Sequence, residues 1–200
     1  MVVATRRKFS IEEYHQLVDL GFFTENDRIE LIRGEIIEMA PKRTPHSVCN
    51  SILFGELYKL LGDRANVRGQ EPILLPSNSE PEPDVVIAQK KTDNYLSAHP
   101  TAEDIILIVE ISDSTLKYDS PKETLREREI KLSLYAEANI NYYWIINLVD
   151  NYLEVYNNPF SDDRGKFYYR NKSIFLPDDS IEIPNFEDIS LELKTIFPAI

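Results

Sequence analysis

The chain has 200 residues, of which 42% are hydrophobic and 28% charged, a composition typical of one folded domain rather than of a disordered chain. Its 22 Lys and Arg residues are outnumbered by 34 Asp and Glu residues, so the formal net charge is −12. This balance argues against a protein held on nucleic acid by its overall charge, but it permits a local cleft in which metal ions supply positive charge. The single cysteine, Cys49, excludes a disulfide framework and a thiolate zinc site.

No segment reaches the roughly 18 consecutive apolar residues of a membrane span. The first ten residues, MVVATRRKFS, lack the apolar core of a signal peptide. We therefore expect a cytoplasmic protein with no membrane partner. No repeat or long linker divides the chain, so we expect residues 1–200 to form a single domain.

The first elements are predicted to be a helix and a strand hairpin. Ser10 and Glu13 have the spacing of a capping box, so a helix should begin here and end near Gly21. Residues 28–39, RIELIRGEIIEM, are typical of two short apolar strands that turn at the central Arg-Gly pair.

A second helix and three strands should follow. The helix is expected to begin with Thr44 as its N-cap and Pro45 in its first turn, and its broad apolar stripe indicates that it packs against a sheet. Strands are predicted over residues 67–75, 83–88 and 104–112. The last two are almost continuous aliphatic runs, which is typical of strands covered on both faces.

The C-terminal part is predicted to add one helix and further strands. Pro121 should start a third helix that ends near Ala138, and residues 141–148 and 152–156 are expected to form a pair of strands. The tail should hold short strands and a last helix near residues 188–197. This order of elements predicts an α/β layered domain with a mixed central sheet.

Three side chains stand where such a sheet could build a polar site. Asp84 follows Pro83 at the start of an apolar strand, where a carboxylate can reach a cleft. Glu110 lies inside the run ILIVEIS, and a carboxylate buried in a covered strand is costly unless it has a partner or faces a site. Lys131 shares a side of the third helix with apolar residues. Each also has an ordinary explanation. Asp84 can be a turn residue, Glu110 can be a buried acid with a polar partner, and the aliphatic part of Lys131 can cover apolar surface while its amine lies in water.

Together these residues are the minimal set for metal-assisted phosphodiester hydrolysis. Asp84 and Glu110 would hold Mg²⁺ or Mn²⁺, with the backbone carbonyl of Ile111 and waters as further ligands. Lys131 would position the attacking water or stabilise the transition state as a point charge. We expect the oxygens of the two carboxylates to lie about 3 to 6 Å apart, and the lysine amine within about 6 Å of one of them.

Several segments accompany these residues. They are ELIRGEIIEMAP (30–41), PEPD (81–84), ILIVEISDST (106–115), REREIKLSLYAEANINYYWIINL (126–148) and IEIPNF (181–186). In their order and spacing they resemble the Uma-type endonuclease-like family, a branch of the PD-(D/E)XK nuclease superfamily. The resemblance covers about residues 8–198 and implies a restriction-endonuclease-like core, a mixed sheet flanked by helices.

The resemblance also implies roles for individual residues. Asp84 matches the Asp of the motif and Glu110 its acidic residue. The motif expects a lysine two residues after that Glu, where this chain has Ser112. Lys131 looks like the replacement, supplied from the following helix, and Ser112 becomes a supporting residue. Asp119 resembles a family position near the cleft.

Three further residues are candidates for supporting roles. His46, in the first turn of the second helix, could contact a phosphate or a water, although an imidazole near a helix start often only makes a local hydrogen bond. Glu30 could add a third carboxylate to the metal site or could face solvent. Gln70 resembles another family position near the cleft.

Two functions of different classes are consistent with the sequence. The first is a Mg²⁺- or Mn²⁺-dependent endonuclease, a hydrolase whose partner is DNA and which as a homodimer could cut both strands. The second is a nuclease fold that does not use catalysis and serves as a protein-interaction or regulatory module. The acids and the lysine favour the enzyme, whereas the net charge of −12 favours the module or a specialised substrate.

Overall fold

The computed structural model describes residues 6–24, 27–113 and 121–197, with only the backbone described for 121–127. Its centre is a six-stranded mixed sheet of order β3-β4-β5-β6-β7-β8. These strands are β3 (Ala65–Gly69), β4 (Val85–Gln89), β5 (Ile105–Ser112), β6 (Tyr142–Asn147), β7 (Tyr152–Ser161) and β8 (Phe167–Phe175). In this sheet β5 and β6 pair parallel and the other neighbours pair antiparallel. The connection between the parallel pair carries helix α3 (Pro121–Glu137), as such a crossover requires.

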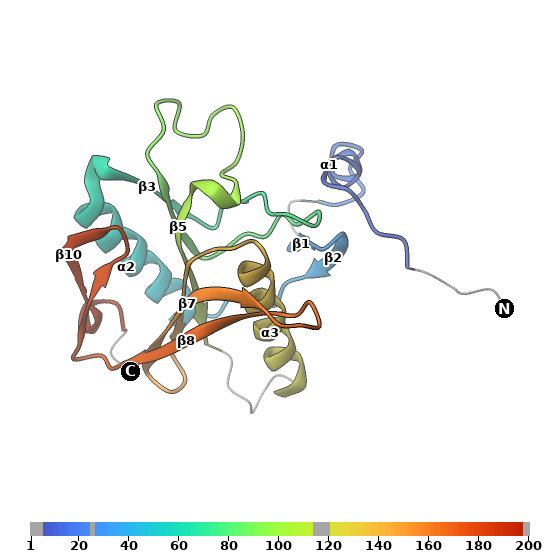
Figure 1. Cartoon of the computed structure of the whole chain (residues 1–200). Helices are drawn as coiled ribbons and strands as arrows, with labels where there is room; N and C mark the ends of the chain where they lie inside the picture. The colour runs from blue at the N-terminus through green and yellow to red at the C-terminus, as the bar shows by residue number, and fades with distance from the viewer. Residues whose placement is uncertain (1–5, 25–26, 114–120, 198–200) are drawn as a thin grey trace.

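Helices and small hairpins cover both faces of the sheet (Figure 1). On one side lie α2 (Thr44–Leu61) and a hairpin of β9 (Ser180–Ile183) and β10 (Phe186–Glu192). On the other lie α3 and a hairpin of β1 (Ile29–Ile32) and β2 (Glu35–Glu38), with α1 (Ile11–Asp19) beyond it. The sheet therefore separates two hydrophobic cores, as the predicted α/β fold with a mixed sheet flanked by helices requires.

Strand β5 shows how this layering directs its side chains. Val109 and Ile111 belong to the core under α2, and Ile108 belongs to the core under α3. Successive side chains of a strand point to opposite faces, so Glu110 points to the α3 side. The prediction that this strand is covered on both faces is confirmed.

The predicted order of the first elements is also confirmed. Ser10 and Glu13 form the capping box of α1, and the hairpin β1–β2 turns at Arg33 and Gly34. Within the described ranges, no helix is long and apolar enough to cross a bilayer.

Three local predictions were wrong. Arg43, not Thr44, is the N-cap of α2, because the Ser47 N–H already donates to the Arg43 carbonyl at 3.0 Å. The strand predicted over residues 67–75 ends at Gly69, since Gln70 takes a positive φ of 54° that breaks the extended backbone.

The helix predicted over residues 188–197 is instead strand β10 followed by the short 3-10 helix Leu193–Thr195. Its buried residues Ile189, Leu191 and Leu193 alternate with exposed ones, and β9 supplies the pairing that fixes this extended conformation.

Candidate active site

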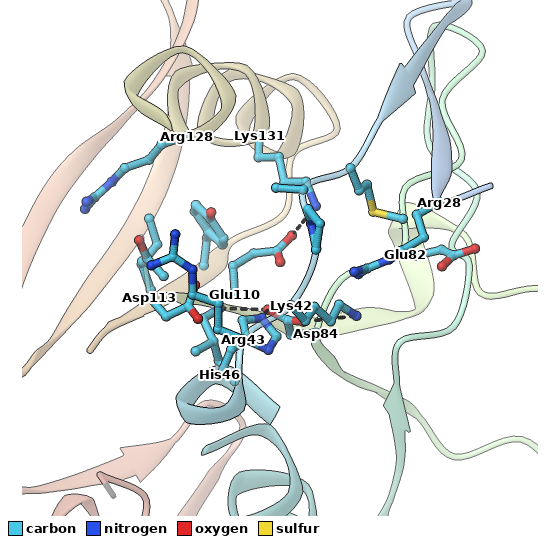
Figure 2. Close-up of a pocket in the computed structure, with 17 residues that line it drawn as sticks. Arg28, Lys42, Arg43, His46, Glu82, Asp84, Glu110, Asp113, Arg128 and Lys131 are labelled. Atoms are coloured by element: carbon cyan, nitrogen blue, oxygen red, sulfur yellow. Dashed lines mark hydrogen bonds and ion pairs between the residues drawn. The ribbon is translucent and has the colours of Figure 1, made fainter. Parts of the chain in front are cut away.

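A cleft of about 370 Å³ lies where β4 begins and β5 ends, between α2 and α3 (Figure 2). Val85 pairs with Val109 across the antiparallel β4–β5 ladder. The residue before Val85 and the residue after Val109 therefore fall next to each other at one edge of the ladder. These residues are Asp84 and Glu110, and both line the cleft.

Asp84 is almost fully buried and is held from several sides. Its Oδ2 accepts the backbone N–H of Ile111 and the Nε2–H of His46, both at 2.9 Å. Its Oδ1 lies 3.4 Å from Gln70 Nε2 and 3.8 Å from Lys42 Nζ. Burial disfavours its charged form, but the hydrogen bonds from His46 and Ile111 outweigh burial and hold the pKa of Asp84 below its usual value. Asp84 is therefore a carboxylate at neutral pH.

Glu110 is the second acid of the cleft and has a different environment. Its Oε1 accepts hydrogen bonds from Lys131 Nζ at 3.0 Å and from the Tyr135 hydroxyl at 2.7 Å. Burial, together with the negative charges of Asp84 and Glu30, outweighs the opposing effects of Lys131 and the Tyr135 hydroxyl and raises the pKa of Glu110 to about 7. The two acids of the cleft thus have pKa values displaced in opposite directions.

Lys131 reaches from α3 into the same cleft (Figure 2). Its amine lies 3.1 Å from Glu30 Oε1 as well as 3.0 Å from Glu110 Oε1. Burial alone would lower the pKa of Lys131, but the two carboxylates raise it above its ordinary value, so the side chain is a fixed cation. Lys131 and both predicted acids are therefore brought together in one cleft.

The supporting residues divide according to what they contact. Glu30 is buried, so the alternative that it faces solvent is wrong, and its Oε1 accepts from the backbone N–H of Glu82 at 3.0 Å as well as from Lys131. His46 lines the cleft and donates to Asp84, which is 38 residues away in the sequence, so its bond is not the local one that is usual near a helix start. Ser112 lines the cleft at the end of β5. Asp119 lies outside the described residues.

The backbone at Ile111 faces the two acids. The carbonyl of Ser112 accepts the N–H of Leu148 on the β6 side at 2.8 Å. Backbone groups alternate in direction along a strand, so the carbonyl of Ile111 faces the opposite edge of β5, toward Asp84, which already accepts the N–H of Ile111. A third oxygen donor thus accompanies the two carboxylates.

This donor set fits a hard divalent cation. Within the described part of the chain, the hydrogen bonds of Glu110 fall on Oε1, while Oδ1 of Asp84 has only the long contacts with Gln70 and Lys42. No group of three or more His, Cys, Asp or Glu side chains among the described residues is arranged to hold a metal ion. Two carboxylates, one backbone carbonyl and waters are the ligands that Mg²⁺ takes when it is not held in an all-protein cage.

Of the acidic and cationic side chains that line the cleft, the sequence analysis singled out only Asp84, Glu110 and Lys131 as site residues. The cleft is lined by five cationic and four acidic side chains: Arg28, Lys42, Arg43, Arg128, Lys131, Glu82, Asp84, Glu110 and Asp113. In a chain with a net charge of −12, this is a local enrichment in positive charge. Tyr135 was also missed, although it follows Lys131 by one helical turn, a spacing that places both on one face of α3.

Comparison with known proteins shows the family and the fold of this chain. A family model described as Uma2, putative restriction endonuclease, matches residues 11–194. The fold is similar to a crystal structure described as a putative nuclease belonging to DUF820 from Anabaena variabilis ATCC 29413. The TM-score is 0.66 with 15% sequence identity, over 94% of this chain and 97% of that chain. No curated protein matches the chain. The structural likeness shows a shared fold, and the family description supports a nuclease function.

Proposed function

The chain belongs to the Uma2 family, and from that premise we propose that it is a metal-dependent DNA endonuclease that hydrolyses phosphodiester bonds. One arrangement supports this function above all. Two acids that line one cleft, buried Asp84 and half-buried Glu110, lie at the same edge of the sheet, and Lys131 is bound to Glu110 at 3.0 Å. Asp84 immediately precedes β4, Glu110 lies in β5 and Lys131 in α3, so the fold itself assembles the set.

Asp84, Glu110 and the carbonyl of Ile111 would hold Mg²⁺ or Mn²⁺, with waters as the other ligands. When bound, the cation supplies a water of lowered pKa and stabilises negative charge on the phosphate. Asp84 is ready to bind because its own hydrogen bonds keep it ionised. Glu110 has a raised pKa, so its ionisation and the binding of a cation are coupled.

Lys131 supplies a positive charge that does not depend on the metal. Its amine is fixed between Glu110 and Glu30, so it needs no reorganisation to face a substrate phosphate. A preorganised cation in a site from which water is partly excluded stabilises a transition state in which negative charge grows on the phosphate. Glu30 acts as a positioning residue, because it holds the amine through a second hydrogen bond.

The charges of the cleft favour a polyanionic substrate. Arg28, Lys42, Arg43 and Arg128 surround the acids and the lysine in the lining. Cationic side chains gathered around a site attract the phosphate backbone even when the protein as a whole is acidic. DNA is therefore the proposed substrate, and the cleft rather than the whole surface provides the attraction.

A plasmid-nicking assay tests this proposal. The wild-type chain should convert supercoiled plasmid to nicked or linear DNA in Mg²⁺ or Mn²⁺ and should be inactive with EDTA. Glu110→Gln keeps the shape of the side chain and should be inactive under all conditions. If the folded wild-type chain cleaves no DNA with either metal, the proposal fails and the non-catalytic interaction module becomes the better account of the fold.

A further inference from the structure

A second hollow, of about 810 Å³, lies between α3 and the β7–β8 hairpin, and we name it the α3–β8 groove. Its lining combines cationic, aromatic and acidic side chains: Arg33, Arg128, Lys166, Lys172, Tyr152, Tyr156, Phe167, Tyr168, Glu129 and Glu154. Cations outnumber acids in this lining although the whole chain is strongly acidic. The groove is large enough for a ligand of nucleotide size.

The α3–β8 groove adjoins the proposed active cleft. Arg128 lines both hollows, so they meet at its side chain. Figure 2 shows Arg128 leaving α3 in a different direction from Lys131, which points toward Glu110. A chain-like ligand lying in the cleft would therefore enter the groove as it passes Arg128.

Two cations of the groove are held by one buried acid, while Arg33 is paired with Glu137. Glu154 has an exposed side-chain fraction of 1% and forms ion pairs with Arg128 and with Lys172, the latter at 2.9 Å. The Tyr156 hydroxyl donates to the same carboxylate. Two cations on one carboxylate leave an excess positive charge, and their fixed positions reduce the entropy lost when an anion binds.

The outer wall of the groove is an edge strand that carries exposed aromatic and cationic side chains. Tyr168 is 39% exposed, and its ring packs on Phe160 with the centroids 5.8 Å apart. Lys172 lies over the ring of Tyr156, 5.4 Å from its centroid, and Lys166 is exposed. Aromatic rings interleaved with cations are the combination that single-strand binding proteins use to stack bases and contact phosphates.

We propose that the α3–β8 groove binds the single nucleic-acid strand that flanks the phosphate being cut. Arg128, Lys166 and Lys172 contact its phosphates, and Tyr168 stacks on one of its bases. This inference rests on the proposed nuclease function, because the strand reaches the groove from the cleft. It adds a binding surface to that function and makes a separate prediction about affinity.

Fluorescence anisotropy with a labelled single-stranded oligodeoxynucleotide tests the groove. All variants carry Glu110→Gln, so that no strand is cut. Lys166→Gln with Lys172→Gln should weaken binding about tenfold and lower the slope of log affinity against log salt by about 1.4, since each contact to a single strand contributes about 0.7. Lys59→Gln with Lys194→Gln removes the same charge from exposed lysines outside both hollows, and should change affinity less than twofold.

Two further variants separate the groove from general effects. Lys166→Gln alone removes an exposed lysine without taking a partner from buried Glu154, so it should weaken binding while thermal unfolding stays unchanged. Tyr168→Ala should weaken single-strand binding about tenfold through lost stacking and leave duplex binding nearly unchanged. Equal losses for the groove pair and the control pair, or equal losses of duplex and single-strand binding in Tyr168→Ala, would overturn the inference.

Failure of the groove and failure of the nuclease function give different results. If the chain with Glu110 intact nicks plasmid while the groove variants bind single strands like the parent, the inference fails and the function stands. If that chain cleaves nothing but the groove variants lose single-strand affinity, the groove is a binding surface and the function fails.

Discussion

The carboxylate of Asp84 accepts the backbone N–H of Ile111 at 2.9 Å and so takes the place of the next residue of the β4–β5 ladder. The ladder ends at the pair Val85–Val109, and the edge of β5 beyond it has no backbone partner from β4. A single side chain thus terminates the ladder and fixes the end of β5, from which Glu110 projects.

This bond makes Asp84 a structural residue as well as a candidate metal ligand. Asp84→Ala should lower the free energy of unfolding by about 1–3 kcal/mol, because it leaves a buried N–H without an acceptor. Asp84→Asn keeps an acceptor oxygen and should recover most of that loss. Midpoints of urea unfolding measure both effects. Equal stability of the alanine and asparagine variants would show that the bond to Ile111 contributes nothing.

The contrast between Glu110 and Lys131 is the second prediction. Glu110→Gln should abolish binding of Mg²⁺ or Mn²⁺, because it removes a ligand. Lys131→Met should keep metal binding, since its amine is no ligand, but should slow cleavage by about 10²–10³-fold. Calorimetric titration with the metal and plasmid nicking measure the two effects. A Lys131→Met variant that cleaves as fast as the parent would remove the lysine from the mechanism.

The role of Glu30 is tested through Lys131. Glu30→Gln keeps an oxygen that can accept from the lysine amine and from the N–H of Glu82. It removes the negative charge that strengthens the hydrogen bond to the amine, so cleavage should fall only about tenfold. In a Lys131→Met background the same change should have almost no further effect, because residues that act as a unit are not additive. Additive losses in the double variant would mean that Glu30 acts independently of the lysine.

The sequence was sufficient for the parts of the fold with an unambiguous hydrophobic pattern. Strands β4 and β5 are aliphatic runs too short for helices, and α2 has a broad apolar stripe. In the segment 188–197 the apolar residues Ile189, Leu191 and Leu193 have the period-two spacing of a strand, a signal that the prediction of a helix overlooked. Its pairing with β9, a tertiary contact, decides that it is a strand.

The same reasoning explains which site residues could be found. Glu110 and Lys131 stood out because a charged side chain among apolar neighbours needs a reason. Arg28 and Lys42 lie outside regular elements, where no periodicity indicates direction. Tyr135 was hidden because an aromatic residue on the inner face of a helix looks like ordinary core.

The last prediction concerns the pH dependence of stability at Glu154. Burial alone would raise the pKa of Glu154, but the hydrogen bonds from Arg128, Tyr156 and Lys172 outweigh it and lower the pKa below the ordinary value of a glutamate side chain. A carboxyl whose pKa is lower in the folded state stabilises the fold above its unfolded pKa, and the contribution is lost as pH falls through the folded pKa.

The wild-type chain should therefore be more stable than Glu154→Gln at pH 7. This difference should shrink as the pH falls below about 4.5. Urea unfolding of both proteins at a series of pH values measures it, with Glu192→Gln, an exposed acid paired with Lys194, as the control. A difference that stays constant from pH 7 to acid conditions would mean that the charge of Glu154 does not stabilise the fold.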